Sequence, residues 1–212
     1  MQTRVSLPAP MVVLFLAVFP ALCPEEASAQ AFFVDASLNQ GFADDPLPSP
    51  VGFSVTMGRT NMVGRIGIHA GVRQLYEDGA ELAQHCNFAT CTPGPFDQSF
   101  SMRLAFVGLS YDFPNPTDVY LNLAVNLGRT QQTEHLENMT SGEKFDSGGG
   151  EETTLGGALD LRLRPFIGPL RPAFSARYDR IFQGDCLADG VCFPERDVWT
   201  LSVGLSWVAP AR

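Results

Sequence analysis

The sequence predicts an all-β fold in which eight antiparallel strands follow one another up and down and close into a barrel. Three observations predict this fold. Apolar and polar residues alternate with a period of two, the alternation recurs in eight segments, and the connections between segments are alternately short and long. A period of two places successive side chains on opposite faces of a strand, so each segment has one apolar and one polar face.

The clearest strand lies between residues 153 and 164. Leu155, Leu159, Leu161 and Leu163 alternate with small or charged residues, whereas a helix would scatter these leucines around its axis. The same pattern predicts seven further strands, at residues 32–39, 51–58, 65–73, 100–113, 119–128, 170–179 and 199–207.

The segment 100–113 is the least regular, because its apolar residues change parity near Val107. Phe100 to Phe106 hold one parity and Val107 to Phe113 hold the other. Either a β-bulge near Val107 realigns the strand, or small apolar residues fill the interior of the barrel near one end.

The connections fall into two classes. Residues 59–61, 114–117 and 165–169 are tight turns rich in Asn, Pro and Gly, whereas residues 40–50, 76–99, 130–151 and 182–197 are long, polar and rich in Gly and Asp. The long connections occur at every second position, which places them all at one end of the barrel. Short turns at one end and long loops at the other are typical of a transmembrane β-barrel.

The polar face of the strands indicates which side of the barrel meets the membrane. It carries arginine, aspartate and His69 among glycine, alanine and serine, whereas a soluble barrel would expose lysine and glutamate there. We therefore expect apolar side chains outside and a charge network inside that plugs the lumen. Its predicted members are Asp35, Arg65, Arg103, Asp160, Arg162, Arg177 and Asp179. Because the arginines outnumber the aspartates in this set, the network could also hold water or admit anions.

Aromatic residues cluster near the strand ends, where the two membrane interfaces would lie. They are Phe32, Phe33, Tyr111, Phe113, Tyr120, Tyr178, Trp199 and Trp207.

The N-terminus predicts export. Arg4, a short apolar run from Met11 to Leu22 and the small residues Ala27-Ser28-Ala29 form a signal-peptide pattern over residues 1–29, which leaves residues 30–212 as one barrel domain. The apolar run is shorter than the roughly 20 residues of a membrane helix.

In an exported chain, the close pairs Cys86 with Cys91 and Cys186 with Cys192 predict two disulfides. A metal site is the alternative, but the spacings match no zinc motif.

With this layout the chain resembles the OmpA/OmpX-like family of small outer-membrane β-barrels over residues 31–208. The last strand, Trp199 to Trp207, carries the sharpest part of the resemblance, because its alternating apolar residues end in an aromatic residue like the insertion signal of such barrels. In the family that aromatic residue is normally the last one, whereas here Val208 to Arg212 follow. The resemblance implies a bacterial outer-membrane protein.

Composition and motifs narrow the function. The net charge of −9 argues against a nucleic-acid partner. We find no set of a nucleophile, a base and an orienting group that could form a catalytic site, and we interpret His135 as a solvated loop residue. We therefore expect that the protein is not an enzyme and binds no cofactor or metal.

The expected partners are outer-membrane lipid and surface, host or envelope molecules that contact the four long loops. The expected role is structural, adhesive or recognition. The alternatives are a small pore, a lipid-modifying enzyme and a soluble ligand-binding barrel.

Overall fold

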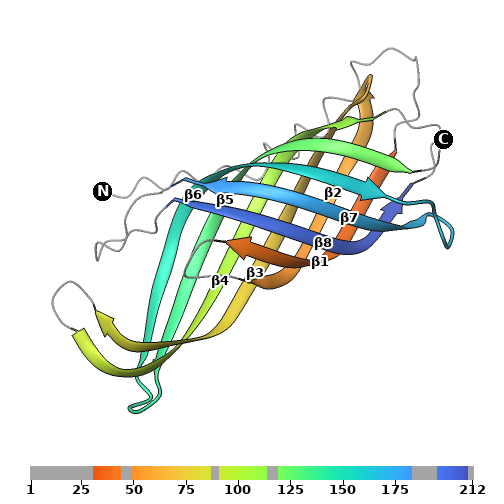
Figure 1. Cartoon of the computed structure of the whole chain (residues 1–212). Helices are drawn as coiled ribbons and strands as arrows, with labels where there is room; N and C mark the ends of the chain where they lie inside the picture. Colours follow the sequence, from red (N-terminus) through yellow and green to blue (C-terminus); the bar gives the residue numbers. More distant parts are fainter. Residues whose placement is uncertain (1–30, 44–48, 87–90, 114–118, 183–194, 210–212) are drawn as a thin grey trace.

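The computed structural model describes residues 31–43, 49–86, 91–113, 119–182 and 195–209, of which the side chains of 79–86, 91 and 146–150 are not considered. These residues form eight antiparallel strands in sequence order, closed into a barrel (Figure 1). The strands are β1 Phe32–Ala43, β2 Val51–Val63, β3 Ile66–Cys86, β4 Cys91–Asp112, β5 Tyr120–Asn138, β6 Lys144–Arg162, β7 Leu170–Ile181 and β8 Arg196–Val208. The predicted fold class is confirmed. The described residues contain no helix that is long and apolar enough to cross a membrane.

Pairing of β1 with β8 closes the barrel, from Phe33 opposite Val208 to Ala43 opposite Val198. A row of paired residues that leaves β6 at Glu151 crosses every other strand and returns to β6 at Leu161, ten residues further along. This stagger tilts the strands by about 35–45° from the barrel axis, and eight tilted strands leave an interior just wide enough for side chains.

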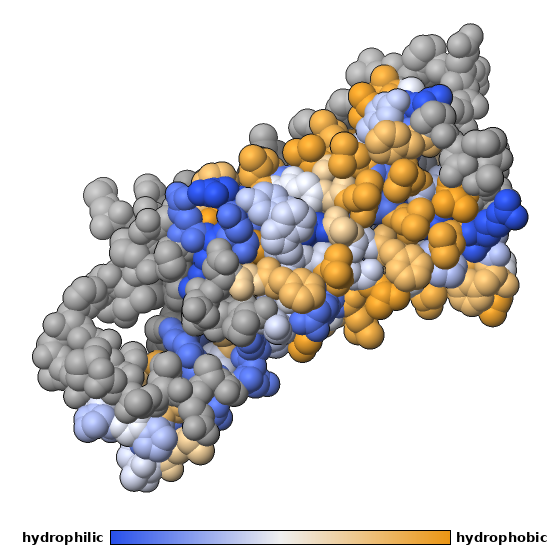
Figure 2. All heavy atoms as spheres, viewed as in Figure 1, coloured by the Kyte–Doolittle hydropathy of each residue, from blue (hydrophilic) through white to orange (hydrophobic). Residues whose placement is uncertain are grey.

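The outward-facing side chains are apolar around the middle of the barrel. Leu159 is 47% exposed, whereas its neighbour Ala158, on the opposite face of the same strand, is 2% exposed. Figure 2 shows apolar residues covering the barrel wall, with hydrophilic residues gathered toward the end from which the long hairpins extend. Large exposed apolar side chains occur on every strand, for example Leu38, Phe53, Val72, Leu109, Val125, Leu159, Phe174 and Val203. Polarity is therefore reversed relative to a soluble protein.

Four strands extend well beyond the others at one end of the barrel. β3, β4, β5 and β6 have 19 to 22 residues, whereas the remaining strands have 12 or 13. The prediction of loops at 76–99 and 130–151 is therefore wrong for most of these residues. They continue the strands and form two long hairpins, β3–β4 and β5–β6 (Figure 1). Phe96 and Leu136 are buried on one face of this extension, and Phe96 packs edge-on against Phe145. Of the other two predicted loops, residues 44–48 and 183–194 lie outside the described residues.

β4 resolves the irregular parity of segment 100–113. β4 pairs with β5 without a register shift from Asp97 to Tyr111, and its pairing with β3 is also regular on both sides of Val107. The predicted β-bulge near Val107 is therefore wrong. Phe100, Met102 and Phe106 are buried inside the barrel instead, while Val107 and Leu109 face outward. Apolar residues therefore fill part of the interior, as the alternative explanation predicted, but they are large residues and not the small ones expected.

Two smaller expectations also change. The β2–β3 turn was expected at residues 59–61, but β2 continues to Val63 through an irregular register, and the turn lies at Gly64, which has a φ of 63°. Phe33 was expected at an interface, but it faces the interior with 2% exposure. Phe32, Tyr111 and Trp207 do face outward, near the end of the barrel where the tight turns lie.

The reversed polarity can be tested by placing a charge on the outer wall. We expect Leu159→Arg to lower the free energy of unfolding by about 2–4 kcal/mol, because a guanidinium would enter the hydrocarbon near its middle. Urea titration in phospholipid vesicles would measure this. Asp97→Arg, on an exposed site of the extended hairpins, serves as the control and should change stability by less than about 0.5 kcal/mol. Equal effects of the two substitutions would mean that Leu159 does not face lipid.

Candidate functional site

The interior of the barrel is the candidate site, because alternation directs three arginines and three aspartates into it. Asp35 comes from β1, Arg73 from β3, Asp160 and Arg162 from β6, and Arg177 and Asp179 from β7. Glycine, alanine and serine occupy many of the positions between them, which leaves room for the long side chains. Each buried charge needs an opposite charge or a hydrogen bond, because burial removes its water.

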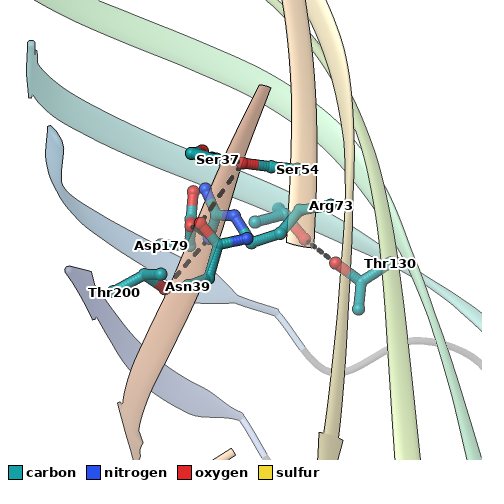
Figure 3. Close-up of polar contacts among 8 residues, drawn as sticks. Ser37, Asn39, Ser54, Arg73, Thr130, Asp179 and Thr200 are labelled. Carbon is teal, nitrogen blue, oxygen red and sulfur yellow. Dashed lines mark hydrogen bonds and ion pairs between the residues drawn. The ribbon is translucent and has the colours of Figure 1, made fainter. Parts of the chain in front are cut away.

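Arg73 and Asp179 form one ion pair. The Arg73 Nη1 lies 2.6 Å from Asp179 Oδ2, and both side chains are at most 3% exposed. Arg73 Nη1 also donates to Thr200 Oγ1 at 3.1 Å, which links β3, β7 and β8 across the lumen (Figure 3). Nearby, the hydroxyls of Ser37 and Ser54 lie 2.8 Å apart, so β1 and β2 are joined by polar side chains as well (Figure 3).

Arg162 and Asp35 form the second ion pair, with two hydrogen bonds. Arg162 Nη2 donates to Asp35 Oδ2 at 2.6 Å and Nε donates to Oδ1 at 3.2 Å. With its amide oriented to suit both neighbours, Asn122 donates to Asp160 at 2.9 Å and accepts from Arg162 Nη1 at 2.9 Å. The guanidinium of Arg162 also lies 4.0 Å from the centre of the Phe33 ring. Asp160 is thus joined through Asn122 to the ion pair of Arg162 and Asp35.

Arg177 borders a small polar cavity. Its guanidinium lies 4.3 Å from the centre of the Phe106 ring, and its Nη1 has no hydrogen-bond partner among the described residues. The cavity has a volume of about 30 Å³, and Ser175 and Ser202 contribute hydroxyl groups to its wall. That volume suits about two water molecules, which the guanidinium and the hydroxyls can hydrogen-bond.

An apolar cluster closes the lumen on the side of the long hairpins. It consists of Leu75, Phe100, Met102, Ile181 and Val198, all at most 5% exposed. Arg196 lies against it, 5.5 Å from the centre of the Phe100 ring. An ion crossing the barrel would have to pass both this cluster and the charged layer.

The structure divides the predicted charge network into two groups. Asp35, Asp160, Arg162, Arg177 and Asp179 lie in the interior. Arg65 is exposed in the β2–β3 turn, and Arg103 lies on the outer wall, where its Nη2 is 3.5 Å from Gln74 Oε1. Including these two in the lumen is wrong, and so is the excess of arginine that suggested an anion path.

The predicted charge network did not include Arg73, although the pattern placed it on the polar face, and the apolar cluster was not predicted. Arg73 shares the inward parity of His69, and this could have identified it. His69 lies 2.5 Å from the Asn126 amide oxygen in the interior. The apolar cluster gave no comparable signal, because its residues resemble lipid-facing ones.

The predicted disulfides stay predictions. Strand pairing sets Cys86 opposite Cys91 at the end of the β3–β4 hairpin, but their side chains lie outside the described part, as do Cys186 and Cys192. The predicted signal peptide, residues 1–29, also lies outside the described residues and stays a prediction. In the described part of the chain no three His, Cys, Asp or Glu side chains gather in a way that could hold a metal ion.

Comparison with known proteins identifies the fold. No protein-family model and no curated protein sequence matches the chain. Among solved structures, a major outer membrane protein from Thermus thermophilus is 13% identical with a TM-score of 0.61, and covers 84% of this chain and 99% of its own. Neisserial surface protein A is 16% identical with a TM-score of 0.56 (84% and 97%). The attachment invasion locus protein Ail of Yersinia pestis is 14% identical with a TM-score of 0.53 (86% and 100%). These barrels share the fold of this chain.

Two adjacent glycines provide a test of the charged interior. A Cβ added at Gly156 would lie 2.1 Å from Asp179 Oδ1 and 2.7 Å from the Tyr178 carbonyl oxygen, whereas one at Gly157 would meet only the Ala124 carbonyl oxygen, at 3.5 Å. We therefore expect Gly156→Ala to lower the free energy of unfolding by about 1–3 kcal/mol, because it displaces the partner of Arg73. Gly157→Ala should be neutral or slightly stabilising. Urea titration of both variants would measure the difference, and equal stabilities would contradict the packing described here.

Proposed function

We propose that this chain is a non-enzymatic outer-membrane β-barrel, exported by its N-terminal signal, which holds two long hairpins outside the cell for adhesion or surface recognition. The observation that carries the proposal is the combination of an apolar outer wall with a closed interior. Leu159 and its counterparts on the other strands suit lipid, while Arg73–Asp179, Arg162–Asp35 and the apolar cluster fill the lumen. A filled lumen favours a structural scaffold over a transport path.

The extended hairpins supply the surface for contacts. Their outward side chains are mostly polar and charged, for example Asp97, Glu137 and Lys144. They rest on buried Phe96 and Leu136, which give the extension a small apolar layer of its own. A paired extension presents its side chains at fixed positions, which lowers the entropic cost of binding a partner. The names of Neisserial surface protein A and of Ail, an attachment protein, agree with a role at the cell surface.

The single lysine provides a test of orientation. Lys144 lies at the start of β6, where its side chain is 70% exposed beside Glu137. We expect a membrane-impermeant amine reagent to label it on intact bacteria that express the full chain, because the long hairpins lie outside. Mass spectrometry of the purified protein would locate the label, and Lys144→Arg would control for the N-terminal amine. Labelling of Lys144 only after lysis would refute the proposed orientation.

Conductance distinguishes the scaffold from a pore. We expect the purified protein to give no steady single-channel steps in a planar bilayer, because the apolar cluster and the charged layer both block the lumen. The variant F100S/R73S/D179S removes parts of both barriers and should conduct. On a denaturing gel, slower migration of the boiled variant than of the unboiled variant would show that the unboiled barrel had folded. Ohmic steps from the unaltered protein would favour the pore.

A further inference from the structure

The outward side chains change from apolar to polar at one boundary on the face formed by β3, β4 and β5. On β4, Ala105, Val107 and Leu109 face outward below the boundary, and Arg103 is the next outward residue. On β5 the outward residue that follows Leu127 is Arg129. The boundary faces the end with the long hairpins, where the outer membrane interface lies if the proposed function is correct.

Arg103 and Arg129 are close to each other on this wall. Arg103 is paired with Gln131 and Ala105 is paired with Arg129, so the two arginines are diagonal neighbours on one face. Diagonal neighbours in an antiparallel pair are about 7–8 Å apart at their Cα atoms, within reach of long side chains. The two guanidinium groups can therefore approach one anion together.

Of the two arginines, Arg103 has no carboxylate partner among the described residues, and Arg129 has only a long, exposed ion pair with Glu151. Arg103 has only the neutral Gln74 oxygen at 3.5 Å, and Arg129 Nη1 lies 3.9 Å from Glu151, with side chains 54% and 69% exposed. Arg180 on β7 differs, since it lies 2.7 Å from Glu195 and 3.4 Å from Asp197. Arg180 therefore has two acidic partners within the described part of the chain, whereas Arg129 has one distant partner there and Arg103 has none. The guanidinium groups of Arg103 and Arg129 keep donors free for an anion from outside the chain.

We propose that Arg103 and Arg129 bind the phosphate group of an anionic lipid in the outer leaflet. Guanidinium groups match phosphate with paired hydrogen bonds, and the Gln131 amide between them can add a donor. The site faces the membrane interface, where acyl chains would hold such a phosphate in place. The net charge of −9 opposes either anion, and only the lipid has acyl chains to offset that repulsion.

The test compares two pairs of arginines in the folded full-length protein. Native mass spectrometry in detergent would measure binding of bisphosphorylated lipid A and of the same lipid without its phosphates. We expect a preference for the phosphorylated lipid, and we expect R103Q/R129Q to weaken its binding by about tenfold per arginine, since a hydrogen bond to a charged group contributes about that much. R59Q/R164Q, which removes two arginines near the opposite rim, should leave the preference unchanged.

Three outcomes would overturn the site. R103Q/R129Q could bind as the unaltered protein does, or both double variants could lose binding equally, which would indicate a general effect of removing positive charge. Excess inorganic phosphate could displace the lipid, which would assign the site to soluble phosphate. For each variant, the difference in gel migration between boiled and unboiled samples tests separately whether the barrel has folded. Failure of the unaltered protein to insert into vesicles would overturn the proposed function and this site together, whereas insertion without lipid preference would overturn the site alone.

Discussion

Charge pairing inside a closed, narrow cylinder is the constraint on which the rest of the structure depends. Eight tilted strands leave little room for water, so each guanidinium that enters the lumen needs a carboxylate, another polar partner or an aromatic ring there. Arg73 meets Asp179, and Arg162 meets Asp35. These pairs join strands that are distant in sequence, and glycines such as Gly156 make room for them. The close fit of these ion pairs is therefore a condition for closing the barrel.

The two faces of the wall follow different rules. The outside meets one solvent, so its side chains are apolar on every strand between the interfaces. The inside meets only other side chains, so either paired charges or apolar groups can fill it, as Arg73 and Phe100 do at different heights. Both fillings narrow the path for ions, because the charged layer leaves a small cavity and the apolar cluster offers few polar groups.

This difference explains what could be predicted from the sequence. Where the interior is polar, as along the second half of β6 and along β8, alternation predicted the strand and its outward face correctly. On β4 both faces are apolar, so the parity was ambiguous and a bulge seemed necessary. A shift of one residue exchanges the two faces of a strand, and this placed Arg103 inside. The long hairpins were missed for another reason: their outward side chains are polar, and they resemble loops until the pairing that buries Phe96 is known.

Arginines in this molecule differ in role because of the side of the wall they occupy. Arg73 is enclosed, so its partner must come from the chain, and Asp179 is fixed beside it. Arg180 is outside, and the chain still provides acidic neighbours on β8 and just before it. Arg103 is outside with only a neutral amide nearby. The described part of this acidic chain places no carboxylate beside Arg103, so its guanidinium keeps donors that a phosphate of the proposed lipid would accept from.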